Sequence, residues 1–481
     1  MTSIAVVGGG FGGIGAAVML RRAGYEDVTV FERGERVGGV WHHNTYPGLA
    51  CDVPSHLYEF SFAPNPRWSR RFAPGPEIQA YVEEVARRHG VLERVRTSTE
   101  VTRAAWSDRW TLETTRGEHR ADVLIAACGQ LSVPSIPKLP GLDRFGGPAF
   151  HTAQWRHEVD LAGKRVAMVG TGCSGIQVGP AIQPIVSRLD VYQRSPGWTL
   201  PKMDFAYSPR AQRLFERFPL LQRLDRAAAL GFLELATAGL TGRTWLFPPF
   251  RAVAKRQITS AIKDPELRRK LTPRDQLGCK RIMLTDDWYP TLAQPNVDVI
   301  TERIAEVTPS GIRTEDGAER PADALVLATG FHTHGFVAPM EVVGDGARTL
   351  EEEWAGAPRA YLGLSVPGFP NMFLLYGPNT NGGAGSVIYT IEAAMSHVLS
   401  ALEALERGAA SRIEVRRDAA EAFDRELRSA LVNTVWHSGC TNWYVDANGH
   451  DPQQWPWLWS TYRRRTARIE PGAYEFSGAP R

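Results

Sequence analysis

The feature that most constrains the fold is a glycine-rich turn that occurs twice, each time directly after a short apolar run. The first turn occupies residues 8–13 and follows the run 4–7, and the second occupies residues 170–175 and follows the run 165–169. Each turn leads into a helical stretch and then into another apolar run. The order strand, GxGxxG turn, helix and strand is the fingerprint of a dinucleotide-binding unit. The sequence therefore predicts an α/β fold with two Rossmann-like dinucleotide-binding domains.

The glycines of such a turn have separate roles. The first allows a tight turn, the second lets the backbone approach a pyrophosphate, and the third lets the helix pack closely on the strand. The start of the helix then offers N–H groups to the phosphates. The predicted cofactor-binding positions are Gly8, Gly10 and Gly13 in the first turn, and Gly170, Gly172, Ser174 and Gly175 in the second.

The two units differ at the end of their second strand. Glu32 lies 24 residues after Gly8, and the residue at the same distance from Gly170 is Arg194. An acidic residue suits the free hydroxyl groups of a ribose, whereas an arginine suits a 2′-phosphate. The first unit is therefore predicted to bind FAD and the second NADPH. A solvated arginine at the end of a strand is the alternative for Arg194.

Both units close with an apolar strand that ends in a small residue and a glycine, at residues 123–129 and 325–330. This doubled layout predicts that the NADPH domain is inserted in the FAD domain. The expected organisation is a first part of the FAD domain at residues 1–150, the NADPH domain at 151–325, and a second part of the FAD domain with a C-terminal segment at 326–481.

A helical insertion is expected around residues 205–270, which are rich in Arg, Leu, Phe and Ala. A basic amphipathic helix can bind a membrane surface. A solvated helical cap that shapes the substrate site is the favoured interpretation. The identity of the substrate cannot be inferred from this segment.

Composition excludes several classes of protein. The chain has 55 Lys and Arg against 52 Asp and Glu, without the basic excess typical of nucleic-acid partners. Its five cysteines contain no CxxC, so neither a disulfide scaffold, a dithiol pair nor a metal site is expected. An apolar strand and a glycine turn fill the first ten residues, which argues against a signal peptide. The most apolar long stretch, 227–250, contains Glu234 and Arg243 and is a poor membrane span. A cytoplasmic enzyme is expected.

Two longer signatures extend this interpretation. Residues 145–155 match FxGxxxHxxxW, although Arg156 follows where Pro or Asp is usual, and residues 38–52 match [AG]GxWxxxx[FY]P[GM]xxxD completely. With these signatures the chain resembles the class B flavoprotein monooxygenases, and within them the Baeyer–Villiger monooxygenases. The resemblance covers nearly the whole chain and is least clear at residues 205–270.

The resemblance implies an enzyme that uses FAD, NADPH and O2 to convert a small-molecule ketone to an ester or lactone through a C4a-peroxyflavin. It implies that Arg281 is the catalytic arginine, which stabilises negative charge, and that Asp52 orients its guanidinium. A structural ion pair is the alternative for these two residues. A flavin-containing N- or S-monooxygenase, acting on an amine or sulfide, is the alternative for the whole chain.

The remaining expected contacts are to the cofactors. By resemblance, Lys280 joins Arg194 at the 2′-phosphate of NADPH, and Ser195 assists; a surface lysine is the alternative for Lys280. Gly39 and Trp41 lie in the second signature and are expected to border the flavin. The ketone and the oligomeric state are not predicted.

Overall fold

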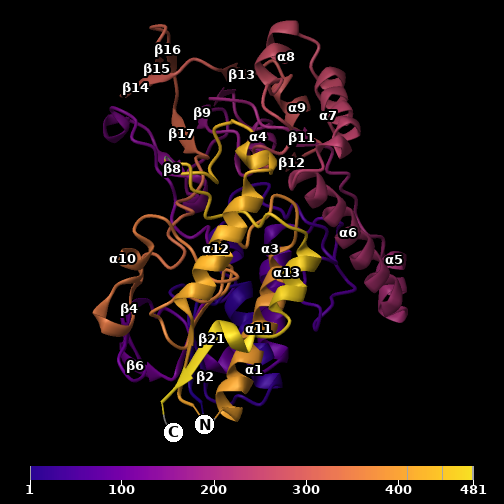
Figure 1. Cartoon of the computed structure of the whole chain (residues 1–481). Coiled ribbons are helices and arrows are strands. Elements are labelled where there is room, and N and C mark those ends of the chain that lie inside the picture. The colour runs from indigo at the N-terminus through magenta and orange to yellow at the C-terminus, as the bar shows by residue number, and fades with distance from the viewer. Residues whose placement is uncertain (1, 409, 447, 479–481) are drawn as a thin grey trace.

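The computed structural model describes residues 2–408, 410–446 and 448–478. Two parallel five-stranded sheets form its centre, one in the lower and one in the upper half of Figure 1. Their strands are short apolar runs buried on both faces, as expected of parallel sheets covered by helices. The predicted α/β fold with two Rossmann-like units is confirmed.

The first sheet has the strand order β19-β7-β1-β2-β3. Its register pairs Ile4 with Val28 and with Val123 on the two sides of the central strand. Its strands are β1 (Ile4–Val7), β2 (Val28–Phe31), β3 (Val95–Arg96), β7 (Val123–Ala126) and β19 (Met372–Leu374). The helices that pack against it include α1 (Phe11–Arg22), α3 (Gly75–Arg88) and α11 (Val387–Arg407).

The second sheet has the order β13-β10-β9-β17-β8. Its strands are β8 (Ala149–His151), β9 (Arg165–Val169), β10 (Arg188–Tyr192), β13 (Val297–Ile300) and β17 (Ala324–Leu327), with α4 (Gly175–Ile182) and α9 (Trp288–Leu292) beside it. All five strands come from the middle of the chain, between β7 and β19 of the first sheet. The second unit is therefore inserted in the first, as predicted. The domain boundaries after residues 150 and 325 stay a prediction, and β8 and β17 lie across them.

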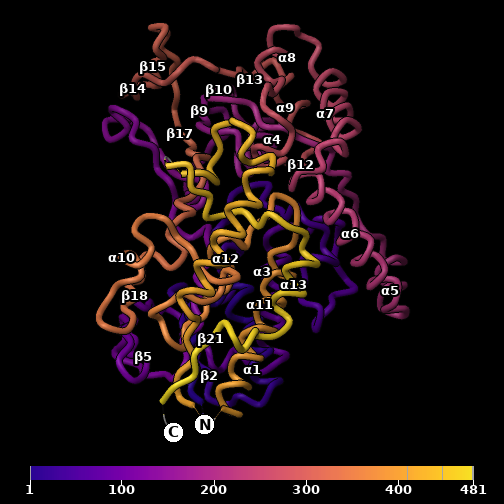
Figure 2. Tube along the Cα trace, in the orientation of Figure 1, coloured from indigo at the N-terminus to yellow at the C-terminus, as the bar shows by residue number. Residues whose placement is uncertain are grey.

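Smaller sheets cover the outer surfaces. One has the order β18-β4-β5-β6 and consists of β4 (Val101–Trp106), β5 (Trp110–Thr114), β6 (Gly117–Ala121) and β18 (Glu341–Val343). Another consists of β14 (Ile304–Thr308), β15 (Gly311–Thr314) and β16 (Glu319–Pro321). Farther along the chain, β20 (Arg412–Val415) pairs with β21 (Tyr474–Ser477). Figure 2 shows the trace of the described residues beginning and ending at the lower edge of the molecule. The other helices are α2 (Val40–His43), α10 (Leu350–Trp354), α12 (Arg417–Leu431) and α13 (Trp459–Thr466).

The predicted helical insertion leaves the second unit between β11 (Thr199–Leu200) and β12 (Met283–Leu284), which pair in parallel. It contains α5 (Pro209–Arg217), α6 (Pro219–Leu240), α7 (Pro248–Ala261) and α8 (Pro265–Leu271), which line the right-hand edge of the molecule in Figure 1. None of the helices in the described part of the chain is both long and apolar enough to cross a bilayer.

Polar contacts dock α6 on the first unit. The side chain of Gln222 donates a 2.8 Å hydrogen bond to the buried carboxyl of Glu59, and His56 lies 2.8 Å from Asp225. Burial raises the pKa of Glu59 to about 8, although the donors around it lower the pKa. The inner side of α6 is thus held by specific contacts, which leaves its outer side to solvent.

Candidate active site

Two glycines of the first turn, Gly8 and Gly13, lie where a side chain cannot fit. Gly8 has φ +111°, and a Cβ on Gly13 would lie 1.7 Å from the carbonyl oxygen of Gly8. A Cβ on Gly39 would lie 3.0 Å from Cα of Gly10, so the second signature passes close to the turn. No side chain caps the start of α1. The free N–H groups and the bare backbone fit a pyrophosphate.

Glu32 closes this turn from the end of β2. Its carboxylate is buried and accepts 2.7 Å hydrogen bonds from the N–H groups of Gly9 and Gly34. Burial raises the pKa of Glu32, but the side chain of His43 and these two N–H groups outweigh it, so the pKa lies below its usual value. His43, 3.8 Å away, is a partner that sequence reasoning missed. Glu32 is therefore ionised and oriented at the predicted ribose position.

Replacing Glu32 with alanine is expected to weaken FAD binding about 10- to 100-fold, since hydrogen bonds to a charged group contribute about 1.5–3 kcal/mol. Titration of the apoprotein with FAD, followed by flavin fluorescence, measures the dissociation constant. Glu35→Ala, at an exposed acid three residues further on, is the control and should bind FAD normally. Equal affinity in both variants would contradict the predicted role.

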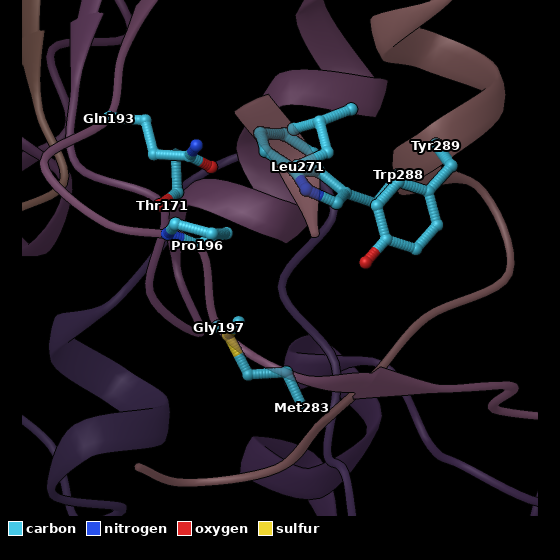
Figure 3. A pocket seen from close by; sticks show the side chains of 8 residues that line it. All are labelled: Thr171, Gln193, Pro196, Gly197, Leu271, Met283, Trp288 and Tyr289. Atoms are coloured by element: carbon cyan, nitrogen blue, oxygen red, sulfur yellow. The ribbon is translucent and has the colours of Figure 1, made fainter. Parts of the chain in front are cut away.

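The second turn repeats the geometry of the first. Gly170 has φ +107°, and a Cβ on Gly175 would lie 2.4 Å from the carbonyl oxygen of Gly170. Gly172 faces open space, and the side chain of Ser174 at the start of α4 makes no capping hydrogen bond. This turn also fits a phosphate group, as the sequence predicts. A small hollow of about 10 Å³ opens beside it, where Thr171, Gln193 and Pro196 face Trp288 and Met283 (Figure 3).

The structure brings two of the three predicted 2′-phosphate residues into contact. The ammonium group of Lys280 donates to the hydroxyl of Ser195 at 3.0 Å, and it pairs with Asp275 at 2.6 Å. Arg194 is exposed and adjacent to Ser195, just beyond the end of β10. Sequence reasoning missed Asp275, which lies five residues before Lys280 without any recognisable motif.

Arg281 and Asp52 form an ion pair although they lie 229 positions apart in the sequence. Nη2 of Arg281 donates to Oδ2 of Asp52 at 2.5 Å, and the two side chains are only 32% and 27% exposed. The charge of Asp52 holds the pKa of Arg281 well above its usual value. Burial raises the pKa of Asp52, but the charge of Arg281 outweighs it and keeps the pKa below the usual value. Both groups therefore stay charged at neutral pH.

Three further side chains influence Arg281 electrostatically, namely those of Cys173, Tyr376 and Tyr444. Burial raises the pKa of Tyr376 to about 12, and it also raises the pKa of Tyr444, against the charge of Arg281. Sequence reasoning gave these residues no catalytic role. The only indication in the sequence was that the segments around Tyr376 and Tyr444 are part of the resemblance to the Baeyer–Villiger monooxygenases.

Cys279 and Cys440 form a disulfide, which the scattered cysteines of the sequence did not lead us to expect. The two cysteines are 161 positions apart, so no spacing motif indicates the pairing. Cys279 immediately precedes Lys280 and Arg281. The bond thus holds the loop that carries both cations against the C-terminal segment that carries Tyr444.

Thiol counting tests this bond directly. The oxidised protein should release three free thiols on unfolding, from Cys51, Cys128 and Cys173, and five after reduction. Cys440→Ser is expected to lower the free energy of unfolding by about 2–5 kcal/mol, because the bond closes a long loop. Calorimetry of the oxidised forms measures the loss, with Cys128→Ser as control. Five free thiols in the unreduced protein would show that the pair is open.

A cavity of about 1120 Å³ lies between the two units. Trp41, Tyr46 and Gly48 line it from the second signature, and Gln177 of α4 lines it from the inserted unit. The hydroxyl of Tyr46 donates to Gln177 at 3.0 Å, so the signature loop docks one unit on the other. Trp41 donates from its indole nitrogen to the hydroxyl of Tyr58 at 3.1 Å. The signature thus lines a cleft large enough for a small molecule.

Two dinucleotide turns, an interdomain cavity and a fixed arginine at the interface define an oxidoreductase that uses a flavin and a nicotinamide cofactor. The family model for an NAD(P)-binding Rossmann-like domain matches residues 6–73. A Baeyer–Villiger monooxygenase of Streptomyces coelicolor is 44% identical over 98% of this chain and 92% of its own length. Another, of Pseudomonas aeruginosa, is 42% identical over 99% and 92%.

Solved structures agree with these relatives. A steroid monooxygenase bound to NADP superposes with a TM-score of 0.88 at 32% identity. The cyclohexanone monooxygenase of Rhodococcus sp. Phi1 bound to NADP+ superposes with the same score at 28% identity, and both alignments cover 99% of each chain. The chain belongs to the Baeyer–Villiger monooxygenases. The predictions of family, enzyme class and cofactors FAD and NADPH are confirmed.

Proposed function

We propose that this enzyme converts a ketone to an ester or lactone at the interface around Arg281. One oxygen atom of O2 enters the product next to the carbonyl carbon, the other leaves as water, and NADPH supplies the two electrons. The observation that carries this proposal is the Arg281–Asp52 pair at the junction of the two units. We further propose the domain division 1–150, 151–325 and 326–481, and a cytoplasmic location.

The residues present fit both cofactors. FAD would lie on the first turn, with Gly8, Gly10 and Gly13 at its pyrophosphate and Glu32 at its ribose; Gly39 and Trp41 would border its ring. NADPH would lie on the second turn, with Gly170, Gly172, Ser174 and Gly175 at the pyrophosphate and Arg194, Ser195 and Lys280 at the 2′-phosphate. Bound FAD would supply the chemistry with O2. The protein would orient the reacting groups and exclude water from them.

Arg281 supplies a permanent positive charge in a mostly buried position. A guanidinium does not lose its proton at any working pH, so it cannot serve as a proton donor in the reaction. It can instead stabilise negative charge that develops on the carbonyl oxygen of the ketone. Because Asp52 already holds it in place, no reorganisation is needed as that charge forms.

Product analysis tests the proposal. The FAD-loaded enzyme is supplied with NADPH, air and a panel of ketones, amines and sulfides, and products are identified by gas chromatography and mass spectrometry. We expect ester or lactone from at least one ketone, with one NADPH oxidised per ester. Oxygenated amines or sulfides without any ester would assign the chain to the alternative reaction.

A further inference from the structure

Large apolar side chains are exposed in one part of the molecule far more than elsewhere. Of the seventeen exposed large hydrophobic residues in the described part of the chain, nine lie on α5, α6, α7 and their connections. We call these nine residues the apolar edge: Leu214, Phe218, Leu220, Leu221, Leu224, Phe232, Leu235, Trp245 and Val253. Trp245 and Leu220 are 73% and 65% exposed. The elements that carry them contact one another in succession, and apolar exposure concentrated in this way marks an interaction surface.

Helix α6 shows how the apolar edge is built. Leu220, Leu224 and Leu235 follow one another at helical spacing on its outer side, and the residues between them on that side are alanines and a glycine. Gln222 and Ala229 on the inner side are buried against the first unit. At 1.5 Å per residue the outer stripe is about 22 Å long. Figure 1 places α5, α6 and α7 in succession along the same side of the molecule.

The acidic and the basic side chains of this region differ in whether they have partners. Residues 203–256 contain nine basic and four acidic side chains. All four acids have partners outside the insertion: Asp204 pairs with Arg70, Glu216 with Arg67, Asp225 with His56, and Glu234 accepts from the N–H groups of Trp459 and Ser460.

The basic side chains of this region are mostly exposed and lack such partners. Eight of the nine are exposed, namely Arg210, Arg213, Arg217, Arg223, Arg243, Arg251, Lys255 and Arg256. Among the described residues, none of these eight forms an ion pair. The exposed surface of the insertion therefore carries leucine and aromatic side chains together with positive charges that have no ionic partner.

We propose that the apolar edge rests on an anionic lipid surface. Acyl chains accept the leucine and aromatic side chains, and lipid phosphates neutralise the arginines around them, which is how amphipathic helices bind the interface. A second copy of this chain is disfavoured, because it would bring two arginine-rich surfaces together. Nucleic acid would match the charge but leave the leucines exposed. Since α6 is docked on the first unit by its polar inner side, the enzyme lies on the bilayer and does not cross it.

Vesicle co-sedimentation tests this proposal without depending on the reaction. The FAD-loaded enzyme is mixed with vesicles of phosphatidylcholine and phosphatidylglycerol, or of phosphatidylcholine alone. We expect binding to the anionic vesicles that weakens with added salt. The double variant Leu220→Asp, Leu224→Asp should need about tenfold more lipid for half-maximal binding. Val432→Asp, at a 69% exposed residue outside the apolar edge, is the matched control.

Three results would overturn the proposal. The first is no sedimentation with anionic vesicles. The second is binding that Leu220→Asp, Leu224→Asp leaves unchanged, which would reduce the contact to surface charge. The third is a dimer in light scattering that this double variant dissociates, which would assign the apolar edge to a second copy. Retained flavin content and NADPH oxidation in the variant show that it is folded, so lost binding then supports the proposal.

Discussion

Arg281→Ala is expected to lower the rate of ester formation about 10²- to 10³-fold, the loss typical of removing one fixed group that stabilises developing negative charge. FAD binding should survive, because Arg281 lies outside both glycine turns. NADPH should still be oxidised, but with little ester formed per NADPH. The measurement is ester yield per NADPH consumed, at saturating ketone and with matched flavin content.

Two further variants separate charge from geometry. Arg281→Lys keeps a positive charge but loses the planar fork that faces Asp52, so its activity should fall between those of the alanine variant and the wild type. Asp52→Asn leaves Arg281 charged but without its ionic partner, and it should reduce activity less than Arg281→Ala. An alanine variant that still yields ester at the normal rate would refute the catalytic assignment of Arg281.

Arg194→Ala, combined with Lys280→Ala, is expected to raise the KM for NADPH about 10²- to 10⁴-fold while the KM for NADH changes little. Both cations would face a 2′-phosphate that NADH lacks, and charged contacts of this type contribute about 1.5–3 kcal/mol each. Steady-state oxidation of the two nucleotides, at fixed ketone and oxygen, gives both values. Lys263→Ala, at an exposed lysine of the same unit, is the control. Equal effects on NADPH and NADH would contradict the 2′-phosphate assignment.

The parts of the fold that could be predicted from the sequence are those determined over short distances along the chain. Each glycine turn lies between its own strand and helix. Its position and its need for glycine can therefore be predicted from about thirty consecutive residues. The roles of Glu32 and Arg194 were predicted in the same way, from their distance of 24 residues from the first glycine of each turn. Their partners are harder to predict: His43 contacts Glu32 from helix α2, and nothing near Asp275 indicates its pairing with Lys280.

Contacts between segments that are distant in the sequence could be predicted only from the resemblance to a known family, or were seen only in the structure. The Arg281–Asp52 pair was anticipated only because both positions match a known family. β18 pairs with β4 across more than 200 residues, and neither strand has a pattern that identifies its partner. The Cys279–Cys440 bond could not be predicted either, because no pattern around one cysteine identifies the other. Sequence periodicity records which face of an element is buried, but not what buries it.

The disulfide also affects how the two units can move. The backbone passes between the units twice, once after β7 and once after β17, and two connections leave an axis about which one body can rotate. Cys279 lies in the inserted unit, and Cys440 lies in a segment whose neighbours Trp436 and Tyr444 pack in the core of the first unit. The disulfide adds a third covalent connection between the two units, which restricts that rotation. In the oxidised protein the cleft should keep one width, and reduction should restore the freedom of the hinge.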